Sequence, residues 1–73
     1  MIKKTLAEFF DEYSACGEIR CNLIYCSESG KDVVSVISHT DIMYVKFKDD
    51  MFTLKSITYD ESYDRYIIDL YLV

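Results

Sequence analysis

The hydrophobic period of the chain changes at Gly17, and this change divides the sequence into a helical part and a strand-forming part. Before Gly17, Leu6, Phe9, Phe10 and Tyr13 recur at the spacing of one helix face. After it, apolar residues alternate with polar ones, and β-branched and aromatic residues dominate. The sequence therefore predicts an α+β fold as a single domain over residues 1–73, with an N-terminal helix packed on one face of a sheet.

The predicted helix is bounded by residues with capping roles. Thr5 and Glu8 have the spacing of a capping box, in which each side chain binds the backbone N–H of the other residue. Gly17 stands where a left-handed C-terminal cap is common. We expect a helix over residues 5–16.

Four clusters of turn-forming residues divide the remainder into five strands. Short turns join neighbouring strands in antiparallel pairs, so the expected sheet is a five-stranded antiparallel meander. Its strands are predicted over residues 18–26, 32–39, 42–48, 51–59 and 65–72. The expected cross-strand pairs are Phe52 with Leu72, Leu54 with Leu70, Lys55 with Asp69, Leu23 with Val36, Tyr25 with Val34, and Val36 with Val45.

Both faces of the predicted sheet carry apolar residues, whereas a sheet with one solvated face alternates apolar and polar ones. The face beneath the helix is the predicted core, made of Ile19, Cys21, Leu23, Tyr25, Val34, Val36, Met43, Val45, Phe47, Phe52, Leu54, Ile68, Leu70 and Leu72. The reverse face is predicted to form an apolar interface of Ile37, Ile42, Tyr44, Ile57, Tyr59, Ile67 and Tyr71. Its bases are Arg20, Lys46, Lys48 and Lys55, with Asp69 against them.

An exposed apolar patch of several hundred Å² usually marks a partner site. Three explanations of the reverse face remain open: strong curvature buries it within the monomer, a second copy covers it in a homodimer, or a foreign protein covers it. We expect a homodimer, although the patch alone does not choose among the three.

Acidic residues give the chain a net charge of −5 and gather on the helix and the turns. The predicted acidic partner surface consists of Glu8, Asp11, Glu12, Asp49, Asp50, Asp60, Glu61 and Asp64. Such a surface suits a protein partner with a basic, nucleic-acid-binding surface. By analogy, small phage inhibitors of defence nucleases, anti-CRISPR proteins among them, use carboxylates to imitate DNA phosphates. The leading hypothesis is a non-enzymatic interaction module of this kind.

Two other functions stay open. One is a single-stranded nucleic-acid binder, in which rings stack on bases while cations follow phosphates; its residues would be Tyr44, Lys46, Lys48, Lys55, Tyr59 and Tyr71. The net charge of −5 disfavours direct nucleic-acid binding. The other is an obligate subunit of a larger assembly, whose interface is the apolar face.

Catalytic and metal-binding residue patterns are weak. His39 is the single histidine and follows no nucleophile motif. Cys16, Cys21 and Cys26 lack the spacing of a zinc site, and their odd number favours reduced thiols in a cytoplasmic protein. We expect no enzyme activity, no cofactor and no metal. No apolar run approaches the roughly 20 residues that cross a bilayer, so no membrane is expected.

Overall fold

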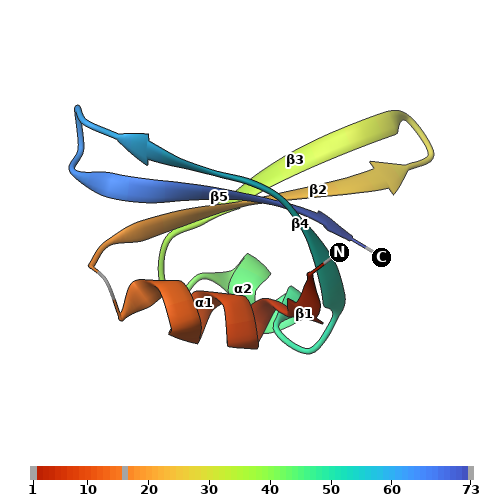
Figure 1. The fold of residues 1–73 in the computed structure, drawn as a ribbon. Coiled ribbons are helices and arrows are strands. Elements are labelled where there is room, and N and C mark those ends of the chain that lie inside the picture. The colour runs from red at the N-terminus through yellow and green to blue at the C-terminus, as the bar shows by residue number, and fades with distance from the viewer. Residues whose placement is uncertain (1, 16, 73) are drawn as a thin grey trace.

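The computed structural model describes residues 2–15 and 17–72, which form an α+β fold with one five-stranded sheet (Figure 1). The strands lie in the order β1-β4-β5-β2-β3, and β2 and β5 run parallel while the other neighbours are antiparallel. Both helices lie on the same side of the sheet. In chain order the elements are β1 (Lys3–Thr5), α1 (Leu6–Ser14), β2 (Ile19–Ser27), β3 (Gly30–Val36), α2 (Ile42–Phe47), β4 (Met51–Asp60) and β5 (Arg65–Leu72).

Helix α1 begins at the predicted capping box. The Glu8 N–H donates to Thr5 Oγ1 at 3.2 Å, and the Thr5 N–H donates to Glu8 Oε1 at 3.1 Å. The helix ends at Ser14, earlier than predicted, and the predicted end at Cys16 lies outside the described residues. The Thr5 N–H and hydroxyl both donate to the Glu8 carboxylate, and these bonds lower the pKa of Glu8.

The lowered pKa of Glu8 makes the capping box sensitive to acid. Its contribution to stability is fully present above the ordinary pKa of 4.5 and is lost as the pH falls through the lower, folded value. Glu8→Gln keeps a side-chain acceptor but does not titrate. We therefore expect the melting temperature of the parent chain to exceed that of Glu8→Gln at pH 6, and the difference to shrink below pH 4.5. A pH-independent difference would contradict this assignment.

The prediction of a strand over residues 42–48 is wrong, because this segment forms helix α2. Asp41 caps the helix, and its carboxylate accepts from the Met43 N–H at 2.9 Å. Tyr44 and Phe47, three residues apart, point into the core, whereas Ile42 and Val45 are 79% and 58% exposed. The β-branched and aromatic residues had suggested a period of two, but tertiary packing selects the helical face.

The loss of this strand changes the topology from a meander to a mixed sheet. Two antiparallel hairpins, β2–β3 and β4–β5, lie side by side through the parallel pair of β2 and β5, and α2 lies between the hairpins in the sequence. The predicted pair of Val36 with Val45 is therefore wrong. The edge strand β1 was not predicted; it pairs with the start of β4, Lys4 opposite Phe52.

The core lies between the inner face of the sheet and the two helices. Leu6, Phe9 and Phe10 of α1 join one buried cluster with strand residues and with α2. Of the predicted core, the exposed Val45 is wrong, while Tyr25, Val34, Met43, Leu54 and Leu72 are partly buried at its margin. The fully or nearly buried strand residues are Ile19, Cys21, Leu23, Val36, Phe52, Ile68 and Leu70.

The β4–β5 register confirms two predicted pairs, Phe52 with Leu72 and Leu54 with Leu70. The third pair is wrong, because an irregularity at Lys55 places Ser56 opposite Asp69. In β2–β3 the register differs by two residues from the prediction: Leu23 lies opposite Val34 and Tyr25 opposite Asp32. A two-residue turn, tighter than expected, closes this hairpin, and a shift of two keeps each side chain on its predicted face.

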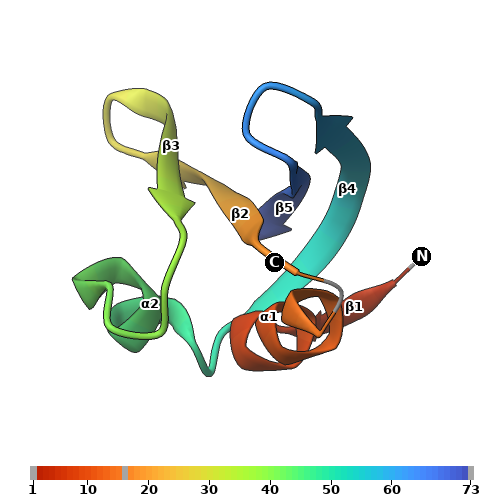
Figure 2. The same cartoon turned by 90° about the vertical axis from the view of Figure 1, so that its left-hand side faces the viewer.

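The sheet curls strongly, and the helices close the open end of the curl (Figure 2). The inner face of the sheet therefore holds the core, and we call the other face, which no described helix covers, the open face. At the end of the β4–β5 hairpin the sheet extends beyond the helices (Figure 1). This geometry leaves three candidate binding surfaces: the open face, the helical side and the overhanging hairpin end.

Candidate binding surfaces

The centre of the open face is polar, because side chains from four strands form one row of hydrogen bonds. Arg20 Nη2 donates to Ser35 Oγ at 2.7 Å, and Ser35 Oγ donates to Asn22 Oδ1 at 2.8 Å. Asn22 Nδ2 and Ser56 Oγ donate to the two Asp69 carboxylate oxygens at 2.8 and 3.1 Å. The row crosses β3, β2, β5 and β4, so it divides the open face.

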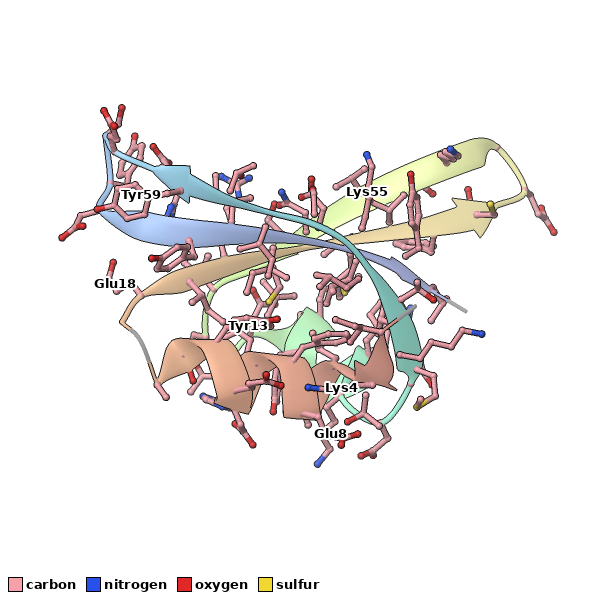
Figure 3. The ribbon with its side chains drawn as sticks, viewed as in Figure 1. Lys4, Glu8, Tyr13, Glu18, Lys55 and Tyr59 are labelled. Carbon is pink, nitrogen blue, oxygen red and sulfur yellow. The ribbon has the colours of Figure 1, made fainter. Side chains whose placement is uncertain are left out.

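Two lysines lie beside one tyrosine ring, on the side of this row that faces the turn of the β2–β3 hairpin. Lys31 Nζ and Lys55 Nζ lie 5.7 and 5.5 Å from the centre of the Tyr71 ring. Lys55 points away from the helices (Figure 3), because the irregularity in β4 turns it outward. Arg20 and Lys55 thus lie on the open face as predicted, together with Lys31, whereas the predicted bases Lys46 and Lys48 belong to α2 and its C-terminal cap.

The predicted apolar interface is not one surface. Ile42 and Tyr44 belong to α2, where Tyr44 is buried and Ile42 exposed, so their placement on the sheet is wrong. Ile37 follows the end of β3 in a loop. The shifted register of β4 places Ile57 and Tyr59 opposite Ile68 and Tyr66, on the inner side of the sheet. Ile67 and Tyr71 remain on the open face, and a homodimer through this face stays a prediction.

The residues of the predicted nucleic-acid surface are likewise dispersed. Tyr44 lies in the core, Lys46 lies in α2 and Lys48 immediately follows it. Tyr59 lies on the inner side of the sheet, which leaves Lys55 and Tyr71 together on the open face. The Tyr71 ring already has two cations over it, so the stacking platform that this hypothesis needs is not assembled.

The eight predicted acidic residues fall into two groups. Asp49 and Asp50 precede β4 and Asp60 ends it, so at about 3.3 Å per residue these carboxylates lie about 30 Å apart along the strand. The first group lies on the helical side and contains Glu8, Asp11, Glu12, Asp49 and Asp50. Backbone bonds from Leu6 N to Asp50 O and from Ala7 N to Lys48 O hold α1 beside the α2–β4 turn.

Basic side chains of the protein itself partly neutralise the negative charge of this first acidic group, which we call the helical acidic group. Lys4 Nζ binds the Glu12 carboxylate, and this hydrogen bond raises the pKa of Lys4. His39 Nε2 lies 3.1 Å from Asp11 Oδ1. In Figure 3, Lys4 and Glu8 lie along the helical side of the molecule. The carboxylates of Glu8, Asp11 and Glu12 are thus engaged by Thr5, His39 and Lys4.

In the second acidic group, Asp60 ends β4 and Glu61 and Asp64 belong to the turn that follows; Asp64 lines an open pocket of about 700 Å³. We call this end of the molecule, together with Glu18 and its pocket, the hairpin end. Glu18 and Tyr59 lie at the same end of the molecule in Figure 3. The pocket is lined by Gly17, Glu18, Tyr59, Tyr63, Asp64, Arg65 and Tyr66.

Two tyrosines form a corner in this pocket. Tyr59 and Tyr66 lie opposite each other on neighbouring strands, with ring centres 5.3 Å apart and planes at 65°. Asp64 adopts a left-handed φ of 49°, which aspartate tolerates, and its carboxylate accepts the Tyr59 hydroxyl. This hydrogen bond is the main cause that raises the pKa of Tyr59, so the hydroxyl stays protonated well into alkaline solution.

The third tyrosine of the pocket binds a cation of the chain. The Arg65 guanidinium carbon lies 4.6 Å from the centre of the Tyr63 ring, and Arg65 Nε lies 3.7 Å from Asp60 Oδ2. Arg65 Nε is buried and has no hydrogen-bond partner within the described part of the chain. The hairpin end thus already contains one guanidinium between a tyrosine ring and a carboxylate.

A smaller pocket of about 310 Å³ shares Gly17 and Glu18 with the first and is also lined by His39. The His39 ring packs edge-to-face on Phe10 and Tyr44, with ring centres 4.6 and 4.9 Å away. Its ring nitrogen faces Asp11, and no nucleophile is among the described partners of the ring. These contacts give His39 a packing role.

Sequence reasoning assigned Asp60, Glu61 and Asp64 to the acidic surface but missed Glu18 and the tyrosines around them. The missed residues are Glu18, Tyr63, Arg65 and Tyr66. A signal was present, because three of the seven tyrosines fall between positions 59 and 66, interleaved with acids. The pocket was missed because the shift in β4 that places Tyr59 opposite Tyr66 follows no turn signal.

Three other features of the described residues are metal ligation, thiol exposure and membrane-spanning helices. Within residues 2–15 and 17–72, no three His, Cys, Asp or Glu side chains gather in a metal-binding arrangement. Of the predicted thiols, Cys21 is buried and Cys26 exposed, while Cys16 is outside the described residues. Across the same residues, no helix has the length and apolar character needed to traverse a bilayer.

Comparisons with protein-family models, curated proteins and solved structures found no match to this chain.

Proposed function

We propose that this chain is a non-enzymatic protein-interaction module that binds a basic segment of a partner protein at the hairpin end. The observation that supports it is the presence of carboxylates at an open, tyrosine-lined pocket. Glu18 and Asp64 line the pocket, Asp60 and Glu61 belong to the same hairpin end, and Arg65 is the one described cation in the lining.

The helical acidic group supports this function less well than the hairpin end does. Glu8 caps α1, Glu12 and Asp11 face Lys4 and His39, and neither of the two pockets described above is lined by a residue of this group. Surface charge alone steers association but contributes little affinity without a cavity or a buried contact. Imitation of a DNA phosphate row needs carboxylates along one continuous surface, and the division of the eight carboxylates between the helical side and the hairpin end disfavours it.

Two double variants with identical net charge test where a basic partner binds. Glu18→Lys with Glu61→Lys alters the hairpin end, and Asp49→Lys with Asp50→Lys alters the helical side. Each pair of reversals raises the net charge from −5 to −1. All four residues are exposed, and the backbone bonds of Glu18 and Asp50 do not depend on their side chains.

The probe is a fluorescent ten-residue peptide rich in arginine and lysine, titrated at low and physiological salt. We expect the hairpin-end variant to lose affinity roughly 10-fold more than the helical-side variant, because Glu18 lines the pocket and Glu61 lies in the same turn as the lining residues Tyr63 and Asp64. Equal losses would mean that the peptide responds to net charge alone, and a larger loss in the helical-side variant would move the contact to α1. Either result would overturn the proposal.

A further inference from the structure

We infer that the tyrosine corner of the hairpin end is a binding site for the guanidinium group of a partner arginine. This inference rests on the proposed function, because it names the side chain that would anchor a basic segment. The site consists of the rings of Tyr59 and Tyr66 and the carboxylates of Glu18 and Asp64.

The chain itself shows how this hairpin binds a guanidinium. Arg65 lies 4.6 Å over Tyr63 and has Asp60 beside its Nε, so ring and carboxylate hold the same cation. Arginine suits this arrangement because its flat guanidinium stacks on aromatic faces and offers several donors to carboxylates. Tyr59, Tyr66 and Asp64 repeat the combination of rings and carboxylate on the neighbouring side of the turn.

The tyrosine corner of Tyr59 and Tyr66, with the Asp64 carboxylate, has room for a cation from a partner protein. Among the described residues, cations lie over Phe9, Phe47, Tyr63 and Tyr71, but not over Tyr59 or Tyr66. Tyr59 and Tyr66 are 49% and 40% exposed, so a partner side chain can reach their faces. The pocket volume of about 700 Å³ lies within the range of ligand sites and exceeds what one side chain fills.

The electrostatics of the corner favour a cation over an anion. The faces of aromatic rings carry negative potential, and the carboxylates of Glu18 and Asp64 add formal negative charge. Arg65 also lines the pocket, but Asp60 and the Tyr63 ring compensate its charge. Two backbone features hold the corner in place: the bond from Tyr66 N to Glu18 O and the pairing of Tyr59 with Tyr66.

A matched pair of ligands tests the charge requirement. One short capped peptide contains a single arginine between glycines, and the other contains citrulline, which has nearly the same shape but no charge. Each is titrated into the ¹⁵N-labelled full chain and followed by amide chemical shifts. We expect arginine to shift the amides of Glu18, Tyr59, Asp64 and Tyr66, with an affinity at least about 5-fold above that of citrulline. Equal affinities would overturn the inference.

A matched pair of variants tests the location. Tyr66→Ala removes one wall of the corner, and we expect it to weaken arginine binding by about 5- to 30-fold. Tyr71→Ala removes a ring of the same strand on the open face and is expected to bind as the parent chain does. The dispersion of the amide spectrum checks that both variants fold; if Tyr66→Ala does not fold, Glu18→Gln replaces it, with a smaller expected loss.

The outcomes separate this inference from the proposed function. If the long basic peptide requires the hairpin-end charges but Tyr66→Ala binds arginine normally, the proposed function is retained and the arginine site at the tyrosine corner is rejected. If Tyr66→Ala loses affinity for arginine while the charge reversals leave the affinity for the long peptide unchanged, the arginine site is retained and the proposed function is rejected. Titration with inorganic phosphate covers the opposite chemistry: shifts centred on Arg65 that exceed those from arginine would identify an anion site and overturn the inference.

Discussion

Tyr44→Glu is expected to lower the free energy of unfolding by about 3 to 5 kcal/mol, which is most of the stability of a domain of this size. Tyr44 is 7% exposed and packs edge-to-face on Phe10, with ring centres 5.2 Å apart. Burial raises the pKa of Tyr44, and the negative charges of Asp11 and Asp49 raise it further. A carboxylate at this position would meet the same desolvation and the same repulsion.

Ile42→Glu is the matched control for this prediction, because it places the same charge on the same helix. Ile42 is 79% exposed, so the expected change in stability is within about 0.5 kcal/mol. Urea unfolding followed by circular dichroism measures both variants. If residues 42–48 formed a strand, both side chains would lie on one face and the two variants would behave alike; a large loss for both would therefore contradict helix α2.

The Cys21 thiol is expected to react with a disulfide reagent about 1000-fold more slowly than the Cys26 thiol in the folded chain. Burial raises the pKa of Cys21 to about 12 from the ordinary value of 9.0, and each unit lowers the reactive thiolate fraction tenfold. Cys26 lies near the end of β2 and is exposed. Steric exclusion of the reagent from the core slows Cys21 further.

The measurement uses a Cys16→Ser background, so that the signals come from the two described thiols. Stopped-flow absorbance gives the two rates, and removal of the fast phase by Cys26→Ser identifies it. In guanidinium chloride the two rates should converge, because unfolding removes the burial that separates them. Similar rates in the folded chain would mean that the inner face of β2 is not part of the core.

Local signals allowed most elements to be predicted from the sequence. The capping box of Thr5 and Glu8 placed the start of α1, and turn clusters placed β2, β4 and β5 to within a residue or two. Alternation identified the inner residues of β2 and β5, because a face buried under helices must be apolar. These are features in which short-range pattern and tertiary packing agree.

The features that failed depend on contacts between distant segments. Residues 42–47 contain strand-forming types, but Tyr44 and Phe47 are buried together only if the segment is helical. The irregularity at Lys55 follows no turn signal, yet it moves Ile57 and Tyr59 to the other side of the sheet. The tyrosine pocket was missed for the same reason, since it depends on this shift and on the approach of Glu18.

The parallel contact between β2 and β5 governs the order in which the molecule can assemble. Each hairpin closes a short loop, whereas Ile19 and Tyr66 meet across about two thirds of the chain, and closing a longer loop costs more entropy. The hairpins can therefore form early, but the core is complete only after they join. Nonlocal pairing of this kind slows folding. We therefore expect the pairing of β2 with β5 to be the slow step, which cannot occur before β5, the last strand in the sequence, has been synthesised.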